Sequence, residues 1–208
     1  MYFFVTPLCA MTEPTSPALS PRLEPIERPT SWWMRLVYGM TKWTLGRVIT
    51  PVKVVTARVP GSAAVAQTMN TTAAKLSLDP ELRFLITSYV ATLNGCAFCT
   101  DIAHAHAQNR SVPTNKYNAL LRYDTSDVFS APERAALAYV EEATRNQTVS
   151  DATFETLQAY FDDRAIAEIT WLNAMENYYN LLNRPLNIGA DNLCPVSPDA
   201  HAVPPHAA

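Results

Sequence analysis

The sequence has a nearly unbroken helical pattern between two proline-rich ends. Only five glycines occur in its 208 residues, and the alternation of apolar and polar residues that half-buried β-strands show is scarce. Prolines at positions 14, 17, 21, 25 and 29 prevent helices and sheet ladders near the N-terminus. We therefore expect an all-α fold, with an extended arm over residues 1–30, one helical domain over 31–193 and an irregular tail over 194–208.

Start signals mark several of the expected helices. Asp79 is an N-cap followed by Pro80 at the first helical position. Ser130 and Glu133 have the spacing of a capping box. Together with the apolar periodicity, these signals predict helices over residues 31–49, 62–76, 80–93, 96–109, 113–122, 135–144, 151–161 and 165–182.

The first of these helices is amphipathic and rich in tryptophan. Its large apolar residues recur at helical spacing, with Arg35 and Lys42 on another face: Trp33, Leu36, Val37, Met40 and Trp43. We expect this apolar face to pack on the domain or on a neighbouring subunit. A membrane-surface helix is the alternative, because Trp and basic residues occur together in it.

Composition limits the classes of function. The chain has 16 Lys and Arg against 19 Asp and Glu, a net charge of −3, so it lacks the basic surface that nucleic-acid binding requires. No run of eighteen apolar residues predicts a transmembrane helix, and the first ten residues lack the basic region of a secretory signal. We expect a cytoplasmic protein that does not bind nucleic acid and, unless the alternative for residues 31–49 holds, does not bind membranes, with Met11 as an alternative start.

Two of the four cysteines form a Cys-x-x-Cys motif. Cys9 and Cys194 lie in the irregular ends, which argues against a structural disulfide framework, while Cys96 and Cys99 are three residues apart in the centre. Cys96 falls in the first turn of a predicted helix, where unpaired backbone N–H groups and the helix dipole favour a thiolate. Cys99 follows one turn later and could resolve a sulfenic acid or mixed disulfide. The spacing predicts a redox pair.

Metal binding and an inert core are the alternatives for this motif. A zinc ion would need His104 and His106 as further ligands, but His104 lies about 140° around the helix from Cys99 and His106 about 10 Å along it. Free cysteines are also often buried without a chemical role. We expect no metal and no bound cofactor.

The Cys96-Ala97-Phe98-Cys99 motif after Asn94-Gly95 resembles the alkylhydroperoxidase D-like and carboxymuconolactone decarboxylase superfamily. The similarity covers roughly residues 60–190 and continues in segments 130–139, 149–154, 167–170 and 180–183. The resemblance implies an alkylhydroperoxidase D-like helical bundle that assembles as a trimer or hexamer. It also implies that Cys99 attacks peroxide, that Cys96 resolves the product, and that an external dithiol restores both thiols.

The sequence departs from the family at the proton relay. The family's relay Glu and His would fall at Phe84 and Ala103, which are both apolar. Asp101, His104 or a side chain of another subunit could replace them, because a general base must reach the thiol. Each has a simpler interpretation: Asp101 favours the helix dipole, and His104 is a partly exposed residue on the helix face.

Three functions remain open at this point. The first is a thiol-dependent oxidoreductase acting on a small hydroperoxide or disulfide. The second is a lyase like carboxymuconolactone decarboxylase, whose chemistry needs a base and a cation but no cysteine pair. The third is a non-catalytic oligomeric redox sensor or scaffold that has lost the relay.

Overall fold

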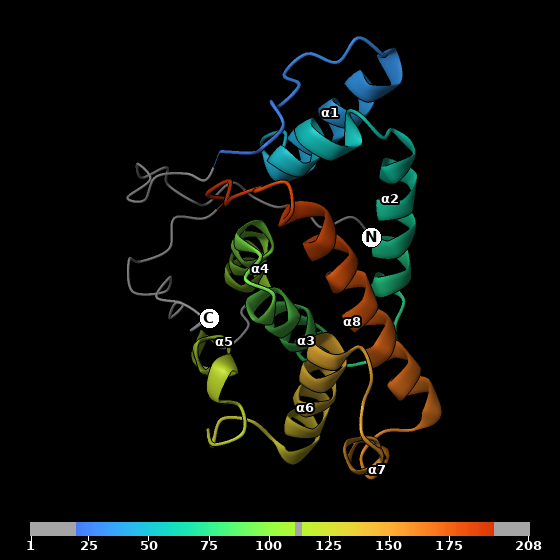
Figure 1. Ribbon diagram of the computed structural model, residues 1–208, viewed down its shortest axis with the longest axis vertical. Helices are drawn as coiled ribbons and strands as arrows, with labels where there is room; N and C mark the ends of the chain where they lie inside the picture. Colours follow the sequence, from blue (N-terminus) through green and yellow to red (C-terminus); the bar gives the residue numbers. More distant parts are fainter. Residues whose placement is uncertain (1–19, 111–113, 194–208) are drawn as a thin grey trace.

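The computed structural model describes residues 20–110 and 114–193, except for the side chains of residues 106–110 and 114. Within these ranges the chain is helical and contains no strand, which confirms the all-α prediction (Figure 1). The helices in chain order are α1 (Trp32–Leu45), the π-helix η1 (Val52–Thr56), α2 (Gly61–Ala74), α3 (Pro80–Leu93), α4 (Ala97–Arg110), α5 (Thr114–Ala119), the 3-10 helix η2 (Leu120–Arg122), α6 (Ala131–Asn146), α7 (Asp151–Gln158) and α8 (Asp163–Asn183).

The predicted caps are formed. The Asp79 carboxylate accepts hydrogen bonds from the backbone N–H groups of Glu81 and Leu82 at the start of α3. Ser130 and Glu133 make both hydrogen bonds of the capping box at the start of α6. Helix α8 begins two residues earlier than predicted, because the Asp162 side chain caps it by accepting from the N–H of Ala165.

The π-helix η1 was not predicted. It is one short turn after Pro51, and so short a segment carries no periodic signal in the sequence. Its central residue, Val54, is fully buried. This turn contributes an apolar side chain to the cluster around Cys96 and Cys99.

The main core surrounds α3, which packs against α4, α6 and α8 (Figure 1). Fully buried side chains from three of these helices meet there: Leu85, Ile86, Val90, Leu137, Val140 and Ile169. Because α3 and α4 are joined by the turn that carries Cys96, this core also fixes the position of the cysteine pair.

Helix α1 packs through a different face from the one predicted. Met34, Val37 and Tyr38 are buried against the segment around η1 and the start of α2. Of the five apolar residues expected to be buried, Val37 alone is; Trp33, Leu36, Met40 and Trp43 are exposed. The expectation that this face packs on the domain was therefore wrong, because α1 is apolar on two faces and spacing alone cannot tell which one the domain covers. Packing on a neighbouring subunit or a membrane surface stays a prediction.

The described part of the N-terminal arm contains no helix. The N–H of Arg22 donates to Leu186 O, and the N–H of Ile26 donates to Lys53 O, so residues 20–31 lie along the domain. Residues 1–19 and 194–208, which include Cys9, Met11 and Cys194, lie outside the described residues. No helix among the described residues is long and apolar enough to cross a membrane.

Candidate functional site

The cysteine pair lies at the turn between α3 and α4. Gly95 adopts φ +60°, a left-handed conformation that glycine takes without steric cost, and this lets the chain reverse direction. The N–H of Cys96 then donates to Ala91 O at 3.0 Å, which ties the first cysteine to the end of α3. Cys96 and Cys99 form a disulfide, with their Cα atoms 5.2 Å apart. The structure therefore shows the oxidised state of the predicted pair.

The disulfide is enclosed by apolar side chains. Cys96 is 1% exposed and Cys99 is 4% exposed. Their cluster includes Val54 of η1, Phe98 of α4 and Ile188, which follows α8. A substrate or reductant can reach either sulfur if part of this cover moves.

The two sulfurs accept different hydrogen bonds. Cys96 Sγ accepts from the backbone N–H of Cys99 at 3.3 Å. Cys99 Sγ accepts from the side-chain amides of Asn180 at 3.1 Å and Asn183 at 3.5 Å. Hydrogen bonds to an ionised acceptor are stronger than those to a neutral one, so in the reduced protein these amides would stabilise a Cys99 thiolate.

A row of asparagines orients the amide beside Cys99. The Asn94 amide donates to Oδ1 of both Asn177 and Asn180, at 2.8 Å in each case. With its oxygen accepting from Asn94, the Asn180 side chain turns its NH₂ group toward the sulfur. Asn94 thus connects the α3–α4 turn to α8.

Glu176 is joined to the same amide. Asn180 Nδ2 donates to Glu176 Oε1 at 2.7 Å. Burial raises the pKa of Glu176 to about 7, against the opposing effect of this hydrogen bond. No Lys or Arg of the described segments forms an ion pair with this carboxyl. Glu176 can therefore bind or release a proton near neutral pH, next to the disulfide.

Tyr179 adds a hydroxyl near this carboxyl. Its hydroxyl is buried, with no hydrogen-bond partner among the described residues, and its ring contacts both the main core and the disulfide cluster. Burial, followed by the charge of Glu176, raises the pKa of Tyr179 to about 12. The hydroxyl therefore stays protonated at neutral pH and, within the described part of the chain, has a free hydrogen-bond donor.

Asp101 binds backbone rather than sulfur. Its carboxylate accepts from the N–H of Asp191 at 2.9 Å and of Leu193 at 3.1 Å. Burial raises the pKa of Asp101, although these hydrogen bonds oppose the shift. The contacts fasten residues 184–193, which we call the covering segment, and Ile188 of this segment lies against the disulfide. Asp101 thus holds the cover of the site.

His104 lies in an aromatic cluster. It is 7% exposed, so the expectation of a partly exposed helix-face residue was wrong: Tyr117 of α5 packs on its ring, with centroids 4.2 Å apart. Tyr117 also contacts Phe84, at 6.0 Å between ring centroids. Phe84 and His104 therefore meet through Tyr117, while Ala103, at the other relay position, packs against the main core.

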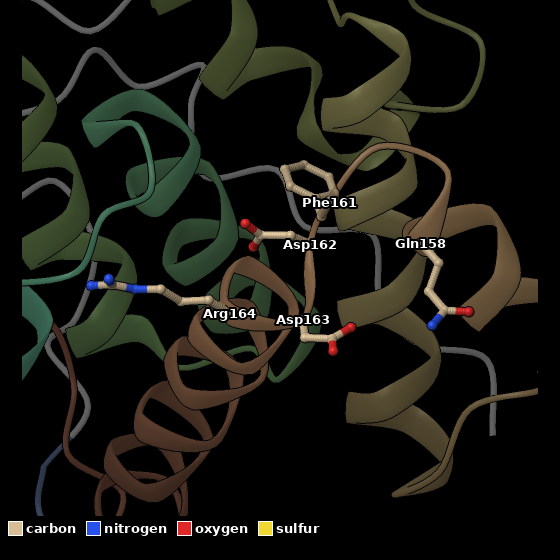
Figure 2. Close-up of a pocket in the computed structure, with 5 residues that line it drawn as sticks. All are labelled: Gln158, Phe161, Asp162, Asp163 and Arg164. Atoms are coloured by element: carbon tan, nitrogen blue, oxygen red, sulfur yellow. The ribbon is translucent and has the colours of Figure 1, made fainter.

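Neither a metal site nor a substrate pocket is evident elsewhere in the described residues. No group of three or more His, Cys, Asp or Glu in this part of the chain could hold a metal ion, and the His106 side chain lies outside it. Two shallow hollows lie away from the disulfide: one beside α1, lined by residues that include Glu27 and Arg35, and one at the α7–α8 junction, lined by Gln158, Phe161 and three charged side chains (Figure 2). Asp162 there caps α8 and Arg164 pairs with Glu168 at 3.1 Å, so both have structural contacts.

Sequence reasoning missed the α8 side of the site. Glu176, Asn180 and Asn183 were not among the candidate residues, although the 180–183 segment was noted for its family resemblance. A signal was present: Asn173, Asn177 and Asn180 fall at spacings of four and three residues on a helix that is otherwise largely apolar. Amides on one buried stripe must find partners, so they indicate a polar contact inside the fold.

Known proteins resemble this chain in sequence. Residues 61–142 match the model of the carboxymuconolactone decarboxylase family. The uncharacterized protein YnjA of Escherichia coli (strain K12) is 36% identical over 118 residues, which are 56% of this chain and 65% of YnjA. The chain thus spans slightly less than two thirds of that relative.

Solved structures share the fold. One is a protein of unknown function from Agrobacterium tumefaciens that has been related to the antioxidant defence protein AhpD. It superposes with a TM-score of 0.61 at 25% identity, and the match covers 66% of this chain and 93% of that protein. A variant of the debrominase Bmp8 in complex with 2,3,4-tribromopyrrole superposes with a TM-score of 0.70 at 21% identity, over 85% and 95% of the two chains. With the match over residues 61–142, the chain is therefore similar in sequence to the carboxymuconolactone decarboxylase family and shares the all-α fold of the AhpD-related protein.

Proposed function

We propose that the protein is a thiol-dependent oxidoreductase that reduces small hydroperoxides or disulfides through Cys99 and Cys96. The observation that carries this proposal is one amide group: Asn180 Nδ2 donates both to Cys99 Sγ and to the Glu176 carboxylate. A sulfur that can form a disulfide, a donor that stabilises its thiolate and a carboxyl that titrates near pH 7 are the groups that such a reaction needs.

In the first step the Cys99 thiolate attacks the outer oxygen of a hydroperoxide. The O–O bond breaks, Cys99 becomes a sulfenic acid, and the departing alkoxide takes a proton to form an alcohol. Glu176 accepts the thiol proton beforehand and returns it to the alkoxide. Since the Cys99 sulfur and the Glu176 oxygen share one donor nitrogen, they lie close enough for direct or one-water proton exchange.

In the second step Cys96 closes the disulfide. Its thiolate attacks the Cys99 sulfur, the S–O bond breaks, and water leaves with the thiol proton. An external dithiol then reduces the disulfide and is itself oxidised, which restores both thiols. With a disulfide substrate, Cys99 would form a mixed disulfide in the first step, and Cys96 would displace the remaining thiol.

The test is stoichiometric oxidation of the reduced protein by cumene hydroperoxide. We expect one equivalent of alcohol per protein and a disulfide between Cys96 and Cys99, detected by mass spectrometry of peptides. A Cys99→Ser variant should give no alcohol above background. If both thiols remain free in the wild-type protein while peroxide is consumed at the uncatalysed rate, the proposal is wrong.

A decarboxylase-like lyase is separated by the same variant. Its chemistry does not need a pair of thiols, so turnover of a carboxymuconolactone by Cys99→Ser at the wild-type rate would favour that reaction instead. A redox sensor would form the disulfide but would not turn over repeatedly with an excess of dithiol and peroxide.

A further inference from the structure

The exposed face of α1 is a continuous apolar surface. Five large side chains on this face, between 51% and 71% exposed, form what we call the α1 aromatic face: Trp32, Trp33, Leu36, Met40 and Trp43. At about 100° per residue they share an arc of about 100°. The opposite side of the helix carries Met34, Val37 and Tyr38, which pack on the domain. Five large apolar side chains exposed on one helix face are typical of a contact surface.

This face lies at an end of the molecule. Helix α1 is at one end of the long axis and α7 is at the other (Figure 1). Three of the four tryptophans of the chain are in α1, and the fourth, Trp171, is in α8. Tryptophan is enriched where one side of a ring is apolar and the other is wet, as at a membrane surface.

The charge of the sequence around α1 is mostly positive, although Glu27 of the arm lies near Arg35 and pairs with Lys53 at 2.9 Å. From Arg28 to Leu78 the sequence contains seven Lys and Arg and no Asp or Glu, whereas the rest of the chain has nine Lys and Arg and nineteen Asp and Glu. Arg35 and Lys42 are exposed on α1 itself, on the flank of the aromatic face. The segment therefore has a strongly positive charge in a protein whose net charge is −3.

This positive charge helps to decide whether the α1 aromatic face binds a second copy of the chain or a membrane surface. Pairing with the same face of a second copy would bring together two segments that each keep an excess of Lys and Arg, Glu27 offsetting only Lys53, and this is unfavourable. A surface of anionic lipid would attract the same cations while the Trp and Leu side chains enter its headgroup region. We propose that α1 binds anionic membrane surfaces through its aromatic face. The inference is independent of the redox activity.

The direct test uses vesicles and tryptophan fluorescence in the full chain. In a Trp171→Phe protein, all tryptophan fluorescence comes from α1, and excitation at about 295 nm avoids the tyrosines. We expect a blue shift and co-sedimentation with vesicles of phosphatidylcholine and phosphatidylglycerol, with much weaker binding to phosphatidylcholine alone and with release at high salt. Equal binding to both kinds of vesicle, or binding to neither, would overturn the proposal.

Matched variants separate the apolar and the electrostatic contributions. Trp32→Ser with Trp43→Ser should weaken vesicle binding at least about tenfold, because two anchoring rings are lost. Lys42→Gln should weaken it about fivefold, while Arg122→Gln, an exposed cation outside the basic segment, should have no effect. Equal effects of Lys42→Gln and Arg122→Gln would contradict the role of the basic segment.

Light scattering tests the competing occupant. If the wild-type protein is a stable oligomer that Trp32→Ser with Trp43→Ser converts to a smaller species, and neither protein binds anionic vesicles, the face is covered by a second copy and the membrane proposal is wrong. Unchanged mass in both proteins, with vesicle binding lost in the variant, supports it.

Discussion

Two partly buried carboxyl groups of this protein have opposite surroundings. Glu141 on α6 accepts hydrogen bonds from the hydroxyls of Tyr89 at 2.8 Å and Tyr123 at 2.9 Å, and pairs with Arg145 at 2.9 Å. Burial opposes its ionisation, but these donors prevail and lower the pKa of Glu141. Glu176 on α8 accepts from the amide of Asn180. Burial prevails there and raises the pKa of Glu176 to about 7.

These opposite pKa shifts suit two different roles: a carboxylate that holds the fold together, and a carboxyl that can exchange a proton. The charge on Glu141 is compensated, so it can hold α3, η2 and α6 together without changing its protonation state. A buried charge without a cation is unfavourable, so Glu176 lowers stability when it is ionised. A group of this kind beside a redox pair is typical of a functional site.

The largest expected effect is on activity. Replacing Glu176 by Gln removes the proton acceptor while keeping the shape of the side chain, and we expect peroxide reduction to slow about a hundredfold or more. Glu141→Gln should keep the rate within about threefold, since that carboxylate contacts neither sulfur. Stopped-flow measurement of thiol oxidation checks both. If thiol oxidation were as fast in Glu176→Gln as in Glu141→Gln, Glu176 would have no special role in the reaction.

The two variants should affect stability in the opposite way: Glu141→Gln should destabilise the fold and Glu176→Gln should stabilise it. Glu141→Gln weakens two tyrosine hydrogen bonds and an ion pair, so we expect the free energy of unfolding to fall by about 2 kcal/mol. Glu176→Gln should raise it by about 1 to 2 kcal/mol at mildly alkaline pH, because a buried charge is removed. Denaturant titration of the oxidised proteins measures both values. Loss of stability in both variants would mean that Glu176 is also a structural group.

The pH dependence of stability should have opposite signs for the two carboxyls. The folded protein holds the Glu176 proton more tightly than the unfolded chain does, since the pKa is raised from its ordinary value of 4.5 to about 7. The stabilising effect of the proton is fully present below about pH 4.5 and is lost as pH rises through about 7, by up to about 3 kcal/mol. Glu141, with its lowered pKa, stabilises above its unfolded pKa and loses this effect as pH falls through the folded one.

Unfolding curves at several pH values, compared with the two Gln variants, check these signs. The stability gained by Glu176→Gln should grow with pH between about 5 and 8. The stability lost by Glu141→Gln should shrink in acid. A pH-independent difference for Glu176→Gln would show that this carboxyl does not titrate in the folded protein.

The amide donors should affect reactivity less than Glu176 does. Asn180→Ala removes the shorter hydrogen bond to Cys99 Sγ and should slow alkylation of the reduced Cys99 by iodoacetamide about tenfold at neutral pH, because the thiolate loses a donor. Asn183→Ala, which removes the 3.5 Å contact, should have a smaller effect. Equal rates in the wild type and both variants would mean that neither amide stabilises the thiolate.

The fold was predictable because its signals are local. The caps at Asp79 and Ser130 and the break at Gly95 fix helix positions within a few residues, and the motif of Cys96 and Cys99 is contiguous. The partners of those cysteines come from α8, more than eighty residues away, and no local pattern states which stripe of that helix faces them.

The expectation that the domain covers the tryptophan-bearing face of α1 failed for a related reason. Both faces are apolar, and the short turn η1, which covers one of them, has no sequence signature. Asp101 and His104 were selected because they are near the cysteines along α4. Their side chains point to the covering segment and to Tyr117, since residues on one helix diverge around its axis.

The smallest expected effect concerns access to the disulfide. Asp101→Asn weakens the hydrogen bonds that fasten the covering segment at Asp191 and Leu193, yet leaves the sulfurs and Glu176 unchanged. Asp191 keeps its hydrogen bonds with Thr50, so the segment should loosen rather than detach. We expect dithiothreitol to reduce the disulfide about threefold faster, because local opening limits access to buried groups. Glu168→Gln, a change at a distant buried carboxylate that holds the α2–α3 loop, is the control and should leave this rate unchanged. An unchanged rate in Asp101→Asn would mean that reagents reach the sulfurs by another route, past Val54 and η1.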